Sequence, residues 1–146
     1  MLYIGSDHGG YALKEELKAF LKKEGVAFVD VGPNRIDPKD DYPEFSAKVA
    51  REISKEPHNN RGILMCRSGH GVSIVANKFK NVRAALCWNE QVARAARNDD
   101  DANILALPSD YISPEIAEEI TRVFLKTPFS GEDRHERRIR EIKALE

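Results

Sequence analysis

The segment 61–78 constrains the fold more than any other part of the chain. It contains the apolar run 63–65, which is too short for a helix and has no polar interruption. A run of this kind is typical of a strand buried on both faces, as in a parallel sheet. Gly69 and Gly71 then allow a tight turn, and helix-compatible residues resume at Ile74. The segment therefore predicts a strand, a turn and a helix, with several backbone N–H groups around one small concavity.

Cys66 is expected at the end of that strand, on the rim of the concavity. Amides and a helix dipole that point the same way favour an anion or a developing oxyanion, and a thiol beside them is a candidate for chemistry. The alternative is a small buried hydrophobic residue, which is the usual state of a free cysteine. Spacing alone leaves both interpretations open. The segment lacks the Walker lysine and the spacing of a dinucleotide fingerprint, so it does not predict a nucleotide site.

Short apolar runs alternate with helical patterns along the whole chain. The expected strands are 2–4, 27–31, 63–65, 83–87 and 103–107. The expected helices are 11–24, 45–53, one from about 74, 90–97, one from 114 with Ile116, Ile120, Val123 and Phe124 as its buried stripe, and 133–146. This alternation predicts a three-layer α/β/α sandwich, a Rossmann-like doubly wound sheet of five parallel strands. Ligands bind at the carboxyl ends of such strands, so the turns after His8 and Cys66 are expected to share one crevice.

Composition excludes several classes of protein. A chain of 146 residues fits one domain, 1–146, and its 23 basic and 24 acidic residues provide no strong field for nucleic acid or a membrane. Two cysteines cannot build a disulfide framework, and the first residues lack the pattern of a signal peptide, so we expect a cytoplasmic protein. The acidic run 98–101 does not match the spacing of a calcium loop, and no metal is predicted.

Other side chains are candidates for binding an anion. Asp7 and His8 precede a helix, where His8 and the glycine amides are able to hold a phosphate, although a capping role explains them nearly as well. Tyr42 is placed either to offer its hydroxyl to a ligand or simply to form a turn. Arg134 and Arg138 lie four apart on one helix face, which suits either a phosphate clamp or a solvated surface.

Taken together, these residues resemble the type B ribose-5-phosphate isomerases, a family that includes the galactose-6-phosphate isomerase subunits. The resemblance is carried, in chain order, by Ser6-Asp7-His8-Gly9 with Lys14, Asp41-Tyr42-Pro43, Gly62 to Cys66, Ser68-Gly69, Gly71, Ser73-Ile74, Ala76-Asn77-Lys78, Arg83-Ala84, Asn103-Ile104-Leu105, and Arg134-His135 with Arg138. It implies a sugar-phosphate isomerase of the pentose phosphate pathway that needs no cofactor. Such an enzyme interconverts an aldose phosphate and a ketose phosphate through an enediolate, with ribose 5-phosphate as the leading substrate.

The resemblance also implies roles for particular residues. Cys66 would move the proton between C2 and C1, and Ser68 would assist exchange between the oxygens. His8, Arg134 and Arg138 would hold phosphate. Further contacts with the substrate would come from Asp7, Tyr42, Gly69, Gly71 and Ser73, with the turn amides stabilising the enediolate. Sites in this family draw residues from both subunits, which implies a homodimer, with a tetramer as the open alternative, and a C-terminal helix (133–146) that packs on the partner subunit.

The chain departs from the family at five positions. Arg67 replaces a glycine and His70 lies between the two turn glycines. Asp99 replaces the ring-opening histidine, Asp100 the following asparagine, and Asp110 an arginine that helps to hold phosphate. We expect Asp99 to take over ring opening, as a general base unless burial or the neighbouring Asp100 and Asp101 raise its pKa, and Arg67 with His70 to supply positive charge. The alternative is that 98–101 is simply a solvated loop.

These departures leave two alternatives to a ribose-5-phosphate isomerase. One is an isomerase of a different sugar, a hexose or an unphosphorylated one. The other is a non-catalytic protein that binds a sugar phosphate. Retention of Cys66 and Ser68 argues against the second alternative, because binding alone needs neither side chain.

Overall fold

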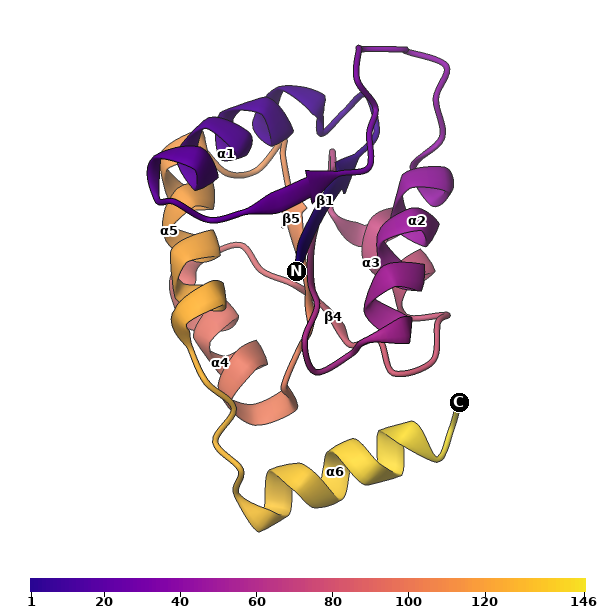
Figure 1. The fold of residues 1–146 in the computed structure, drawn as a ribbon, viewed down its shortest axis with the longest axis vertical. Coiled ribbons are helices and arrows are strands. Elements are labelled where there is room, and N and C mark those ends of the chain that lie inside the picture. The colour runs from indigo at the N-terminus through magenta and orange to yellow at the C-terminus, as the bar shows by residue number, and fades with distance from the viewer.

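The computed structural model describes residues 1–146 as a parallel sheet of five strands enclosed by helices. The strands are β1 (Leu2–Ser6), β2 (Phe28–Asp30), β3 (Arg61–Cys66), β4 (Ala84–Leu86) and β5 (Ile104–Pro108), in the sheet order β2-β1-β3-β5-β4. The helices are α1 (Tyr11–Lys23), α2 (Tyr42–Lys55), α3 (His70–Ala76), α4 (Glu90–Asp100), α5 (Pro114–Lys126) and α6 (Asp133–Lys143). The predicted three-layer fold is confirmed, with α1, α4 and α5 on one face and α2 and α3 on the other (Figure 1).

β3 is the middle strand of the sheet, and this position explains its unbroken apolar sequence. It pairs in parallel with β1 on one side and β5 on the other. Its side chains alternate between two cores: Ile63 and Met65 pack with α1, α4 and α5, whereas Leu64 and Cys66 pack with α2 and α3. A strand with an apolar core on each face has no position for a polar side chain.

Local signals set several helix ends as predicted. The Asn89 side chain accepts a hydrogen bond from Val92 N at the start of α4, and Ser113 caps Ile116 N with Pro114 as the first residue of α5. Gly25 follows α1 with a φ of 70°. Two expectations are wrong in detail. Tyr42 and the proline after it belong to the first turn of α2 rather than to the preceding loop.

The second error concerns α5. Ile116 was expected in its buried stripe but is 47% exposed, while Ala117 on the neighbouring position is fully buried. Small residues also line α4, where Ala93 and Ala96 are buried in the same core. Close packing of α4 against α5 therefore selects the small side chain for the interface and leaves the large one outside.

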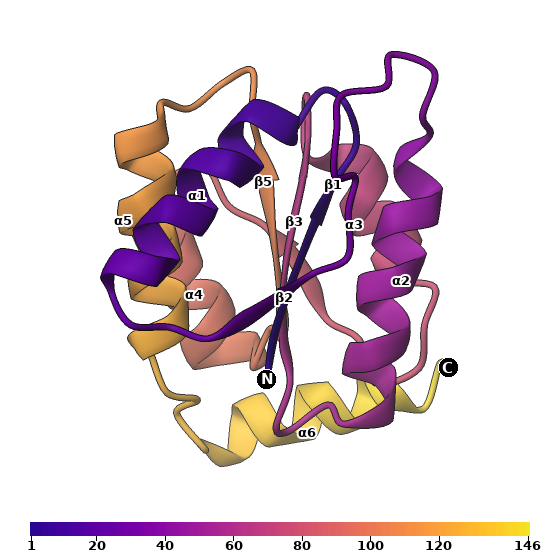
Figure 2. The ribbon, with the colours of Figure 1, turned by 45° about the horizontal axis from the view of Figure 1, so that its top comes forward.

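α6 lies apart from the sandwich, across the end of the sheet where the strands begin (Figures 1 and 2). It leaves a hollow of about 640 Å³ between Ile142 and Leu145 of the C-terminal segment and the residues around β4. Both apolar side chains remain exposed, Leu145 to 88%. No helix of the chain has the length and apolar character needed to cross a bilayer.

Candidate active site

The turns that follow β1 and β3 meet at the carboxyl edge of the sheet. Asp7 N donates to the carbonyl oxygen of Met65 at 3.4 Å, and Ser109 N, after β5, donates to the carbonyl oxygen of Cys66 at 3.0 Å. Because β1, β3 and β5 are neighbours, the residues that follow each strand lie together at this edge. The strand order thus places the turns that carry His8 and Cys66 side by side, at the edge where we expected a shared crevice.

Cys66 is held at the mouth of the glycine turn. Its Sγ accepts a hydrogen bond from Gly69 N at 3.2 Å, and the residue is 5% exposed. Gly69 has a φ of 74°, in the left-handed region, and a Cβ there would lie 2.4 Å from Leu86 Cδ1, so the turn requires glycine. Ser68 Oγ accepts a longer bond from His70 N at 3.4 Å. The Gly69 amide is thus directed at the sulfur from within the glycine turn.

α2 supports the far side of this turn. The Tyr42 ring lies against Gly71, where an added Cβ would come within 2.6 Å of the ring. Ser46 Oγ donates to the carbonyl oxygen of Val72 at 2.7 Å and ties α2 to α3. Ser73 Oγ donates to the carbonyl oxygen of His70 at 3.1 Å, so its hydroxyl is used within the helix. Tyr42 thus lies against the glycine turn that follows Cys66.

His8 is held by a carboxylate that the sequence did not single out. Asp40 Oδ1 accepts hydrogen bonds from His8 N at 2.9 Å and from the His8 ring Nδ1 at 2.7 Å. The hydrogen bond from the ring to Asp40 raises the pKa of His8, helped by the charge of Asp7 and opposed by that of Arg67. Asp7 itself accepts from Gly10 N at 3.0 Å and closes the turn that leads into α1, whose N-cap residue is Gly10.

Arg67 and Asp110 face each other across the turns after β3 and β5. Arg67 Nη1 lies 3.6 Å from Asp110 Oδ2, and both side chains are largely exposed. The Arg67 side chain also lies across Gly9, beside His8. His70, the first residue of α3, is exposed and has no side-chain partner in the chain.

The remaining predicted residues lie at the other end of the sheet. Asp99 and Asp100 end α4, just before β5 begins, and Arg134 and Arg138 are on α6, beyond the start of the strands (Figure 2). Arg134 Nε is 2.7 Å from Glu132, and Arg138 is exposed. One chain therefore does not bring these four side chains to Cys66. An exposed guanidinium is expected both for a solvated face and for a residue that serves a second copy.

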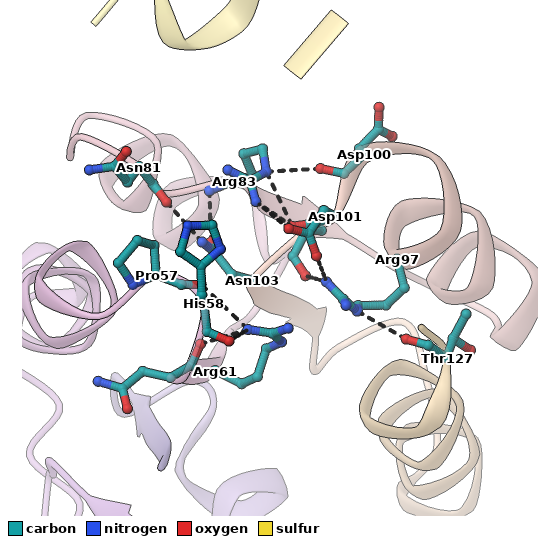
Figure 3. Close-up of polar contacts among 12 residues, drawn as sticks. Pro57, His58, Arg61, Asn81, Arg83, Arg97, Asp100, Asp101, Asn103 and Thr127 are labelled. Atoms are coloured by element: carbon teal, nitrogen blue, oxygen red, sulfur yellow. Dashed lines mark hydrogen bonds and ion pairs between the residues drawn. The ribbon is translucent and has the colours of Figure 1, made fainter. Parts of the chain in front are cut away.

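Asp101 is not part of a carboxylate cluster, which corrects the expectation for Asp99. Figure 3 shows Asp101 between two arginines: Arg83 Nη2 lies 2.8 Å from its Oδ2 and Arg97 Nη1 lies 2.7 Å from its Oδ1. These contacts neutralise the Asp101 carboxylate and direct it into the protein. Asp99 instead lies 3.8 Å from the ring Nε2 of the buried His135.

No group of three His, Cys, Asp or Glu side chains is arranged to hold a metal ion. The residue that sequence reasoning missed at the crevice is Asp40. Nothing in its spacing relates it to His8, which precedes it by 32 residues.

Comparison with known proteins identifies the family. The family model for ribose/galactose isomerase matches residues 2–142. A probable ribose-5-phosphate isomerase B of Mycoplasma genitalium is 43% identical over 97% of this chain and 92% of its own length. The ribose-5-phosphate isomerase B of Escherichia coli is 36% identical over 98% and 94%.

Solved structures agree. The crystal structure of the Mycoplasma genitalium enzyme with bound ribulose 5-phosphate has a TM-score of 0.95 and 42% identity, and the match covers 99% of this chain and 94% of that one. The isomerase B of Clostridium thermocellum gives a TM-score of 0.93 at 42% identity, covering 99% and 95%. The chain therefore belongs to the ribose/galactose isomerase family.

Proposed function

We propose that the protein interconverts ribose 5-phosphate and ribulose 5-phosphate, with Cys66 as the base. The observation that carries the proposal is the Gly69 amide directed at the Cys66 sulfur, on a glycine turn at the carboxyl edge of the sheet. Relatives that match this chain over nearly their full length are named ribose-5-phosphate isomerase B, and one of them was solved with bound ribulose 5-phosphate. Both findings support this substrate.

The proposed reaction moves two protons and leaves the sugar otherwise unchanged. With the ring open, the Cys66 thiolate takes the proton from C2. The electron pair of that bond forms the C1–C2 double bond of an enediolate, while the π pair of the C1 carbonyl moves onto its oxygen. Ser68 passes the proton of the C2 hydroxyl to the C1 oxygen. The thiol then returns its proton to C1 as the carbonyl forms at C2. Backbone N–H groups of the turn stabilise the negative charge that develops on the oxygens.

The proposal places the complete site between two copies of the chain. Asp7, His8, Tyr42, Cys66 and the glycine turn come from one copy, and Asp99, Asp100, Arg134 and Arg138 from the other. Their separation to opposite ends of the sheet supports this division. Exposed apolar side chains support it as well, because four large ones are uncovered in a single copy: Ile74 on α3, Trp88 after β4, Ile142 on α6 and Leu145 beyond its end. A homodimer with two equivalent sites satisfies both observations.

Turnover of a panel of sugar phosphates tests the function directly. Purified protein is assayed with ribose 5-phosphate, hexose 6-phosphates and the unphosphorylated sugars, with Cys66→Ala as the control for contaminating activity. We expect the highest kcat/KM for ribose 5-phosphate. A higher value for another sugar would reassign the substrate. If the correctly folded protein binds a sugar phosphate but turns over none of the sugars, it is a sugar-phosphate-binding protein instead.

A further inference from the structure

We propose that Asp40 is a positioning residue, which holds His8 so that its free ring nitrogen donates to the substrate phosphate. This inference rests on the proposed function, because it concerns the phosphate subsite of that reaction. It assigns a task to a loop residue between β2 and α2 whose side chain makes hydrogen bonds only to His8.

The geometry fixes the imidazole in two ways. One oxygen, Asp40 Oδ1, accepts from the backbone N–H of His8 at 2.9 Å and from its ring Nδ1 at 2.7 Å. Two hydrogen bonds to one oxygen hold both the turn and the ring orientation. The Asp40 side chain is 9% exposed and the His8 side chain 27%, so the carboxylate lies below the ring and the ring meets solvent. Nε2 is left as the ring nitrogen without a partner.

The tautomer then explains why a carboxylate is needed. With the proton of Nδ1 committed to Asp40, neutral His8 would present a lone pair at Nε2 and repel a phosphate oxygen. Only the imidazolium donates from both nitrogens at once. Asp40 favours that doubly protonated state, because a negative charge in contact with the ring stabilises the positive one.

The charges that face His8 agree with this role. Asp7 lies on the same turn, Asp40 on the loop before α2, and Arg67 on the turn after β3, with Asp110 beside Arg67. The two aspartates raise the pKa of His8, and Arg67 lowers it. Asp40 Oδ2 is buried and has no hydrogen-bond partner, so no other group competes with His8 for the Asp40 carboxylate.

The test replaces Asp40 by asparagine, which keeps the shape and the acceptor oxygen but removes the charge. Asp37→Asn is the matched control, because Asp37 lies exposed on the same loop and its side chain accepts only from Lys39 N. The pKa of His8 is measured by NMR titration of the ring, with a His8→Gln variant to assign the signal. KM and kcat for ribose 5-phosphate are followed from about pH 6 to 9, a range in which a histidine titrates.

We expect Asp40→Asn to lower the pKa of His8 and, near pH 8, to raise KM about tenfold, with kcat much less affected. The sugar phosphate loses its own second proton near pH 6 in every variant, so only the difference from wild type is informative. Asp37→Asn should match wild type in both readouts. An unchanged His8 pKa in Asp40→Asn would overturn the proposal, and so would a lowered pKa with an unchanged KM.

The result also separates this proposal from the proposed function. If the wild-type protein does not turn over ribose 5-phosphate, the isomerase assignment fails, whereas the NMR titration still tests the pairing of His8 with Asp40. Addition of inorganic phosphate then tests the anion subsite without catalysis. Phosphate should shift the His8 signal in wild type and less in Asp40→Asn, and equal shifts in both would contradict a positioning role.

Discussion

Two impaired variants should restore activity when they share one dimer, if each site takes residues from both copies. Cys66→Ala removes the proposed base, and Arg138→Ala removes a proposed phosphate ligand on α6. In a mixed dimer one site carries both substitutions and the other carries neither. Random mixing in equal amounts makes half of the dimers mixed, each with one intact site of two, so about a quarter of wild-type activity should return.

The structure gives the reason for choosing this pair. β3 has 6 residues, so Cys66 lies roughly 17 Å from the end of the sheet where α6 is found. The bonds from C2 of a pentose phosphate to its phosphorus span no more than about 8 Å. One substrate therefore cannot contact Cys66 and Arg138 of the same chain. Arg138→Ala alone should raise KM by an amount equivalent to about 1.5–3 kcal/mol, the range for hydrogen bonds to charged groups.

The assay mixes the two purified variants under denaturing conditions, refolds them together and measures isomerase activity at substrate concentrations below KM. Cys66→Ala mixed with Ser68→Ala is the control, because both residues lie on the same crevice and no mixed dimer has an intact site. Activity no greater than the sum of the separate variants, with exchange of subunits shown by mass, would refute the shared site.

Three further predictions follow from individual contacts. Asp99→Asn should slow isomerisation of a cyclic sugar phosphate but not of one that cannot close a ring, and variant rates equal to wild type on both would exclude Asp99 from ring opening. Cys87 should resist alkylation near pH 8 in the native protein, because burial raises the pKa of its thiol to about 12; mass spectrometry checks this, and labelling before unfolding would contradict it. Burial alone would raise the pKa of Asp30, but hydrogen bonds from two lysines and a backbone amide outweigh burial and lower it. The stability that Asp30 contributes is therefore complete above its unfolded pKa of about 3.9 and is lost as pH falls through its folded pKa. In a plot of the free energy of unfolding against pH, Asp30→Asn should therefore lose less stability than wild type at acid pH. An equal loss in both proteins would contradict this role of Asp30.

The fold was predictable because its strongest signals are local. An uninterrupted apolar strand such as β3 requires a covered sheet, and side-chain caps such as Asn89 mark helix starts within three residues. The misplaced α2 start has a local cause too, since proline is compatible with the first turn of a helix and does not delay it. The buried face of α5 was harder, because periodicity gives weight to large side chains such as Ile116, whereas close packing of two helices selects Ala117.

The site was only partly predictable because its contacts are not local. The spacing of Cys66 and Gly69 describes a single turn, and the structure keeps them together. His8 and Asp40 are joined through a loop whose course no periodicity records. Asp101 follows Asp100 directly, yet its side chain turns inward to two arginines at the helix end, where it has a φ of 46°. Adjacent carboxylates in sequence were therefore not a cluster in space.

Arg67 and Asp110 differ in charge from the residues that the family resemblance implies at these positions. Their pairing explains this exchange of charges more simply than a repulsion of the substrate does. Compared with the family pattern, this chain gains a cation at Arg67 and loses one at Asp110, and these two side chains lie 3.6 Å apart. The positive charge expected on the turn after β5 is thus found on the neighbouring turn after β3, where it pairs with the Asp110 carboxylate. The pair is 65% and 46% exposed, so it contributes less than about 1 kcal/mol to folding. Because so weak a pair costs little to break, we expect Arg67 to leave Asp110 when a phosphate binds at this edge of the sheet, and an Arg67→Ala variant with an unchanged KM for ribose 5-phosphate would contradict this.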